Sequence, residues 1–250
     1  MKTTIRLFAA FAFVLAGAAP ALAQGAQSQQ SAAQPWMQLE KELGLQTTYS
    51  VDMSMQTMGM SMESRTIRSG GKTRTEMTMP FMNLKMVALE IPADGKTTSY
   101  SLFPDKKKYV VNAEADRARA AVAAGAPPKI EDLGTEDYQG EACLKRRVTL
   151  VQQGISSEMI MLCSPKQKNM PVKMTMNATM PATAGRPAMP IQSVVLFKNY
   201  DFSKPADGLF AIPSDYVQAA SMQAVMMEGM GNLGAMMQQM QNMQTPQPAE

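Results

Sequence analysis

Residues 47–79 read TTYSVDMSMQTMGMSMESRTIRSGGKTRTEMTM, and polar and apolar side chains alternate along most of this stretch. Alternation with a period of two is typical of β-strands that have one buried face. Gly70-Gly71 separates two of the alternating runs, and a Gly-Gly pair favours the tight turn of a β-hairpin. The stretch therefore predicts short antiparallel strands joined by tight turns.

The same pattern continues downstream of this stretch. We expect further strands at residues 85–91, 96–103, 107–112, 138–151, 155–163, 172–180 and 191–200. Helical spacing predicts a short helix at residues 36–45, which Gly44 ends. The Ala-rich run at residues 113–124 predicts a second short helix, and Gly125 follows it. Eight or nine strands with two short helices favour an α+β fold: one curved antiparallel sheet with short helices over its concave face.

The chain begins with the pattern of a secretory signal peptide. Lys2 and Arg6 supply the positive charge before the apolar stretch 7–19. Ala21-Leu22-Ala23 has the small-x-small pattern of a cleavage site. We expect cleavage near Ala23, a disordered leader over residues 24–35, and a periplasmic or secreted mature protein. The apolar stretch is shorter than the ~20 residues of a membrane span, so we expect no transmembrane segment.

Composition narrows the classes of function. The chain has 26 methionines and no histidine, and histidine is the commonest general base. Carboxylates such as Glu63, Glu76 and Glu90 are spread along the strands without a paired spacing. We therefore predict no catalytic residues, no metal site, no cofactor and no enzymatic activity. Without Lys2 and Arg6 the 24 basic residues become 22, against 21 acidic ones, and this near-neutral charge argues against nucleic-acid binding.

The methionines are the strongest candidates for a binding site. Spacing of two puts Met53 and Met55 on one face of a strand, and likewise Met58, Met60 and Met62, while Gly59 permits a turn or bulge between the two sets. The predicted ligand-binding residues are Met53, Met55, Met58, Met60, Met62, Met77 and Met79.

Three interpretations of these methionines remain open. Unbranched methionine fills irregular space, so the clusters could be core packing alone. Flexible, polarizable side chains also suit a pliable apolar pocket for a lipid or hydrophobic peptide. Thioethers bind Cu(I), which makes a soft-metal site the third interpretation. No histidine or cysteine lies near residues 53–79, however.

Cys143 and Cys163 are the only two cysteines. Gln152-Gln153-Gly154 between them predicts a three-residue hairpin loop with Val151 and Ile155 as flanking partners. In that register Cys143 lies directly opposite Cys163, close enough for a disulfide. We expect a structural intrachain disulfide, as is common in exported proteins.

The C-terminal residues 218–250 form a tail rich in Met and Gln. An apolar stripe runs along it at helical spacing: Met226, Met230, Leu233, Met237 and Met240. Gly229, Gly231 and Gly234 weaken a helix here. The tail is therefore either a marginal helix that orders on docking or a disordered segment.

Several motifs in order resemble a known family. They are Gly70-Gly71-Lys72-Thr73-Arg74, then SLFPDKKKY at 101–109, YQGEAC at 138–143 and GLFAIPSDY at 208–216. Together with the exported leader they resemble the LolA-like superfamily of outer-membrane lipoprotein carriers, in an uncharacterised exported branch with a domain of unknown function. The resemblance covers about residues 45–217, and we take 36–217 as the domain.

The resemblance implies an unclosed β half-barrel whose mouth is covered by helices, with an apolar cavity between them. The implied partner is a lipid or a lipoprotein acyl chain. We therefore expect a periplasmic, non-enzymatic binding protein of the cell envelope with a Met-lined cavity. The alternatives are a periplasmic Cu(I)-binding Met-rich protein and a structural envelope component.

Overall fold

The computed structural model of the chain describes residues 39–57, 59–79, 84–93, 96–113, 127–152, 155–180, 189–226 and 228. The predicted signal peptide, the leader, the helix at 113–124 beyond its first residue, and the tail beyond 228 lie outside the described residues.

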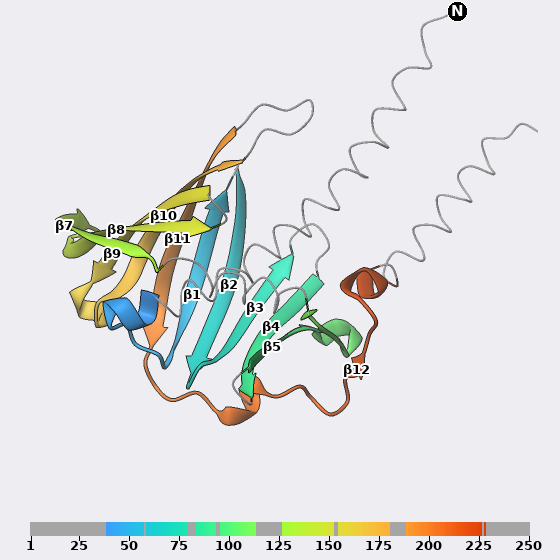
Figure 1. Cartoon of the computed structure of the whole chain (residues 1–250). Helices are drawn as coiled ribbons and strands as arrows, with labels where there is room; N and C mark the ends of the chain where they lie inside the picture. The colour runs from blue at the N-terminus through green and yellow to red at the C-terminus, as the bar shows by residue number, and fades with distance from the viewer. Residues whose placement is uncertain are drawn as a thin grey trace, which may run out of the picture.

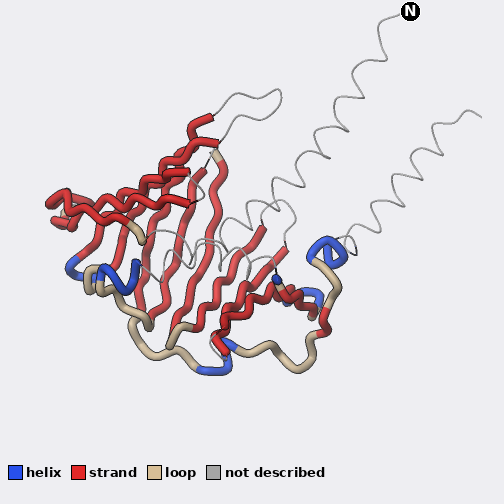
Figure 2. Tube along the Cα trace, viewed as in Figure 1, coloured by secondary structure: helices blue, strands red, loops and turns tan. Residues whose placement is uncertain are grey.

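Strands dominate the described part of the chain (Figure 2). They are β1 Tyr49–Thr57, β2 Met60–Ser69, β3 Lys72–Met79, β4 Leu84–Ala93, β5 Lys96–Phe103, β6 Lys108–Val111, β7 Lys129–Tyr138, β8 Glu141–Gln152, β9 Ile155–Ser164, β10 Met170–Met180, β11 Met189–Asp201 and β12 Val217–Gln218. Short 3-10 helices lie at η1 Pro104–Lys106, η2 Pro165–Gln167 and η3 Asp207–Phe210. α-Helical turns lie at 39–43 and 222–226.

All twelve strands belong to one open sheet. Its order is β12-β6-β5-β4-β3-β2-β1-β11-β10-β9-β8-β7, so the meanders β1–β6 and β7–β11 join where β1 pairs with β11. Every pairing is antiparallel except the short parallel one between β12 and β6. The sheet is strongly curved and its edge strands do not meet (Figure 1).

The predicted unclosed, curved sheet is confirmed, whereas helices over its concave face are not. The two α-helical turns are short and lie near opposite ends of the sheet, 39–43 in blue and 222–226 in red (Figure 1). Gly44, with φ +61°, ends the first turn as predicted. The amide N–H groups of Gly44 and Leu45 donate to the carbonyls of Lys41 and Glu40, which is a Schellman motif.

The strand count was predicted too low because neither β7 nor the two-residue β12 was expected. The sequence of β7, KIEDLGTEDY, has no clear alternation, and its residues are exposed or half-buried. The strand is nevertheless held to basic β8 by cross-strand ion pairs, such as Lys145–Glu136 at 2.7 Å. β7 is an edge strand, where charged side chains also oppose pairing with another chain.

The register defines two faces of the sheet. We call inner the face that carries Tyr49, Val51, Met53 and Met55 of β1, and outer the opposite one. One buried cluster lies on the inner face over β1 and β8–β11, and the helical turn at 39–43 contributes Leu39 to it. The inner face of β3–β6 has a separate cluster, in which Val225 is fully buried. The inner face is therefore covered at both ends.

The C-terminal segment 205–226, here called the strap, covers both faces of the same strands. Ile212 and Tyr216 pack on Val87, Leu89 and Leu102 of the outer face. After β12 the strap reaches the inner face, where Val225 packs in the cluster of β3–β6. Residues 218–226, assigned from the sequence to the tail, thus include part of the packed structure.

The basic run at 106–108 fastens the strap. Lys107 forms an ion pair with Asp215 at 3.0 Å, and Lys108 pairs with Glu228. Lys106 donates to the carbonyl of Val225. All three lysines of the run therefore contact the C-terminal part of the chain.

A candidate binding face

Cross-strand pairings align methionines that are far apart in sequence. Arg146 faces Met161, Met161 faces Met174, Met174 faces Val195, Val195 faces Met55, and Met55 faces Met62. Directly facing residues share a face of the sheet. We call this line across six strands of the inner face the methionine row. Five strand spacings correspond to about 24 Å.

The middle of the row is covered, and both of its ends are half-buried. Met161 is fully buried, and Met174 and Val195 are nearly so. Met55 and Met62 are half-buried, and Met60, one step along β2, is 45% exposed. Apolar surface therefore remains accessible between the two clusters that cover the ends of the inner face.

The structure brings most of the predicted ligand-binding residues together. Met53, Met55, Met60 and Met62 lie on the inner faces of β1 and β2, because the two-residue turn at Gly59 keeps both sets in phase. Met77 is buried next to the strap, facing Met86. Met79 pairs with Leu84 through its backbone. Met58 lies outside the described residues.

Two hollows on the described surface are lined by other residues than the predicted methionines, so the Met-lined cavity stays a prediction. The sequence prediction also omitted Met159, Met161, Met174 and Met176 from the site, although their spacing of two in β9 and β10 carried the same signal.

Arg146 ends the methionine row on β8. It is half-buried, but its Nη1 atom is covered and has no hydrogen-bond partner. No ion pair of Arg146 exists within the described part of the chain. Asp132 faces it across β7, yet one Asp132 carboxylate oxygen accepts from the backbone N–H of Gly134 at 2.9 Å.

The hairpin of the two cysteines has a different register from the predicted one. Gln152 pairs with Ile155, so the loop has two residues, and Leu144 rather than Cys143 faces Cys163. A slip of one residue moves a side chain to the other face of the sheet. Cys163 accordingly packs in the inner cluster, whereas Cys143 does not. The predicted register is wrong, and both cysteines are free thiols in the structure.

Both thiols are poor nucleophiles. Burial raises the pKa of Cys163 to about 11, although the nearby Arg146 guanidinium opposes this rise. Burial also raises the pKa of Cys143, and Glu141 adds to the effect. Because thiolates are the reactive form, neither cysteine is prepared for redox or nucleophilic chemistry.

A buried ion pair fixes the first helical turn to the sheet. Arg68 of β2 pairs with Glu40 at 2.9 Å, and both side chains are about 4% exposed. Tyr49 also donates to Glu40 at 3.5 Å. Breaking such a pair leaves a buried charge and is strongly destabilising. A hollow of about 420 Å³ opens beside it between the helical turn and the end of β2.

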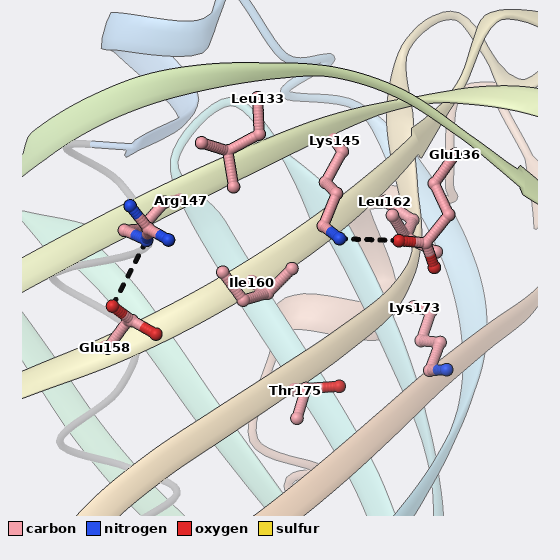
Figure 3. Close-up of a pocket in the computed structure, with 9 residues that line it drawn as sticks. All are labelled: Leu133, Glu136, Lys145, Arg147, Glu158, Ile160, Leu162, Lys173 and Thr175. Atoms are coloured by element: carbon pink, nitrogen blue, oxygen red, sulfur yellow. Dashed lines mark ion pairs between the residues drawn. The ribbon is translucent and has the colours of Figure 1, made fainter.

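A second hollow, of about 380 Å³, lies on the outer face of β7–β10 (Figure 3). Its floor includes Ile160 and Leu162, and ion pairs cross it, including Arg147–Glu158 at 3.2 Å. A hydrogen bond from Lys145 holds the pKa of Glu136 below its ordinary value. Lys173, which also lines the hollow, lies over the ring of Tyr138, with 5.6 Å between its Nζ atom and the ring centroid.

Metal-ligating clusters and membrane spans are absent from the described residues. No group of three or more His, Cys, Asp or Glu side chains there could hold a metal ion. No helix in that part of the chain is long and apolar enough to cross a membrane.

The chain was compared with known proteins by sequence and by structure. No family model and no curated protein matches the sequence. Similar solved structures include an uncharacterized conserved protein from Thermus thermophilus, with 13% identity, TM-score 0.45, and coverage of 76% of this chain and 99% of that one.

Two further similar structures carry lipoprotein names. The Mycobacterium tuberculosis lipoprotein LppX has 9% identity and TM-score 0.36, covering 73% of this chain and 97% of LppX. An outer membrane lipoprotein-sorting protein domain from Vibrio parahaemolyticus has 8% identity and TM-score 0.34, with coverages of 72% and 92%. Similarities this distant say nothing about ligand or activity.

Proposed function

We propose that the chain is an exported, non-enzymatic binding protein that takes an apolar ligand on the inner face of its open sheet. The ligand would be a lipid acyl chain or a hydrophobic protein segment. The observation that carries the proposal is the methionine row, which brings methionines of β1, β2, β9 and β10 onto one face and leaves Met55 and Met62 partly exposed.

Physical chemistry supports an apolar ligand at this face. Burying apolar surface is favourable by roughly 25 cal/mol per Å², so half-buried methionines gain from being covered. Methionine has three rotatable bonds and a polarizable sulfur, which let one face adapt to chains of different shape. The LolA-like resemblance and the signal-peptide pattern of the sequence support an exported carrier in the cell envelope.

A Cu(I)-binding function is the second candidate, because Cys163 lies in the same buried cluster as Met161 and Met174. Thiolates and thioethers are soft ligands that select Cu(I). The raised pKa of Cys163 keeps it protonated near neutral pH and opposes binding. Titration with Cu(I) under reducing conditions tests it, and a tight stoichiometric complex would favour copper over an apolar ligand.

The proposed function is tested by apolar-dye binding to a double variant, Met55→Gln with Met62→Gln. Both side chains are half-buried and face each other. We expect the double variant to lose most of the dye binding, because the open part of the face becomes polar. Ile160→Gln is the control, since Ile160 is half-buried on the outer face. Equal losses in both proteins would contradict the proposal.

A further inference from the structure

Arg146 breaks the chemical pattern of the face on which it lies. Its neighbours two residues away on the inner face of β8 are Leu144 and buried Val148, and its partner on β9 is buried Met161. A guanidinium is always charged and presents five donors. A cation among apolar side chains is costly unless it is paired.

The described residues give Arg146 no ion pair, although Asp132 faces it across β7. Two other carboxylates on the neighbouring strands, Glu131 and Glu158, both pair with Arg147 on the outer face. Asp132 hydrogen-bonds to its own turn at Gly134. The thiol of Cys163 stays neutral and cannot balance the charge. Nη1 of Arg146 therefore remains a covered donor without an acceptor.

We propose that the methionine row binds a single-chain amphiphile with an anionic oxygen headgroup, a carboxylate or a phosphate, which Arg146 recognises while the chain lies along the row toward Met62. This inference rests on the proposed function and adds the class of ligand to it. The row starts at a cation on β8 and continues over Met161, Met174, Val195 and Met55. Arginine matches the planar geometry of carboxylates and phosphates by donating two hydrogen bonds.

The direction of binding follows from burial. Both ends of the row are half-buried, but the Nη1 atom of Arg146 is covered and its cross-strand neighbour Met161 is fully buried. The headgroup therefore lies at this covered donor, where a charged hydrogen bond is stronger than in water. Methionines along the row change rotamer to admit the chain.

The test compares ligands whose straight hydrocarbon chains have the same number of carbon atoms and whose headgroups differ. Laurate carries a carboxylate, dodecyl phosphate a phosphate, and monolaurin an uncharged glycerol ester. Affinities for the full mature protein are measured by displacement of an apolar dye. We expect an anionic ligand to bind about tenfold or more tightly than monolaurin, because hydrogen bonds to charged groups are worth about that much. The two anions distinguish a fatty-acid carboxylate from a phosphate headgroup.

Variants then assign the headgroup contact. Arg146→Gln is expected to bind the anions no more tightly than monolaurin, and its circular dichroism spectrum shows that the variant is folded. Arg146→Lys keeps a charge and retains part of the preference. Arg147→Gln, the neighbour on the outer face, is the matched control and keeps all of it.

Two kinds of outcome would overturn the inference. One refutes the headgroup contact alone, and the other refutes the proposed function as well. Equal wild-type affinities for the anions and monolaurin, or equal losses in Arg146→Gln and Arg147→Gln, would refute the headgroup contact while the apolar face stands. If none of the three ligands binds, the proposed function fails together with the inference. An independent readout is the urea unfolding midpoint without ligand, which we expect Arg146→Met to raise.

Discussion

The two halves of the inner face carry similar side chains, but the rest of the chain covers them to different extents. Over β3–β6 the strap covers Met77 and Met86 with Val225, and it also covers the outer face behind them. Over β1 and β2 the described residues leave Met55 and Met62 half-exposed. The same residue type thus serves as core in one half and as an open face in the other. The difference indicates that cover, and not composition, decides which methionines are available to a ligand.

The largest effect is expected where the strap meets the sheet. Val225→Asp places an unpaired carboxylate against Met77, Met86 and Phe103, and we expect it to cost about 3 kcal/mol or more of unfolding free energy. Urea unfolding measures it. Gln223→Asp is the control, because Gln223 is exposed in the same helical turn. If both variants cost the same, the strap does not hold the β3–β6 half.

Methionine truncation should separate the two halves next. Met86 is 1% exposed, so Met86→Ala should cost about 2–5 kcal/mol through lost burial and a cavity. Met62 is half-exposed, and Met62→Ala should cost about 1 kcal/mol, near the average of point mutations. Thermal or urea unfolding of the two variants gives the comparison. A Met62 cost as large as that of Met86 would mean that the β1–β2 half is core as well.

Acidification should loosen the strap. The Lys107 hydrogen bond lowers the pKa of Asp215, and the Lys108 hydrogen bond lowers that of Glu228. A carboxylate with a lowered folded-state pKa stabilises above its unfolded value, and this contribution is lost as pH falls through the folded-state pKa. The ordinary values are 3.8 and 4.5, so the loss occurs below about pH 4.

Hydrogen exchange at the amides of Val217 and Ala219 reports this loosening, because both donate to β6 and its preceding turn. After correction for the intrinsic rate, protection should fall in acid and in high salt. In the double variant Asp215→Asn with Glu228→Gln, protection should already be low at neutral pH and should not fall further in acid or in high salt. Protection that is unchanged by acid in the wild-type protein would refute the role of the lysine run.

A reducing agent is expected to have no effect on the unfolding midpoint, which is the smallest effect of all. Because Cys143 and Cys163 are on opposite faces as free thiols, the unfolding midpoint should be the same with and without reductant. Non-reducing peptide mapping should recover both cysteines as separate alkylated peptides. A peptide linked through the two cysteines would mean that β8 and β9 pair one residue away from the register in the structure.

The strands of the first half were predictable from the sequence for a simple reason. Alternation between Tyr49 and Met79 follows the burial of one face, and glycines with positive φ mark both turns, at Gly59 and at Gly70-Gly71. β7 was missed because its stability comes from charges on β8, which no local pattern reveals.

The site was predictable in part. The spacing of Met53 and Met55 identified the face, but which strands lie side by side depends on the pairing of β1 with β11, a contact across most of the chain. Arg146 had a local signal, since Leu144 and Val148 place it in the buried phase of β8. The basic run around it concealed that signal. The hairpin loop was one residue shorter than expected, and this alone reversed the face of Cys143.

The most direct test of the central claim is native mass spectrometry of the protein purified from the cells that produce it, comparing wild type with the double variant Met55→Gln, Met62→Gln. The account predicts that the wild-type protein carries added mass of an apolar chain, released by organic solvent, and that the double variant carries little of it. A wild-type protein with a copper ion in place of a lipid, or equal lipid on both proteins, would contradict it.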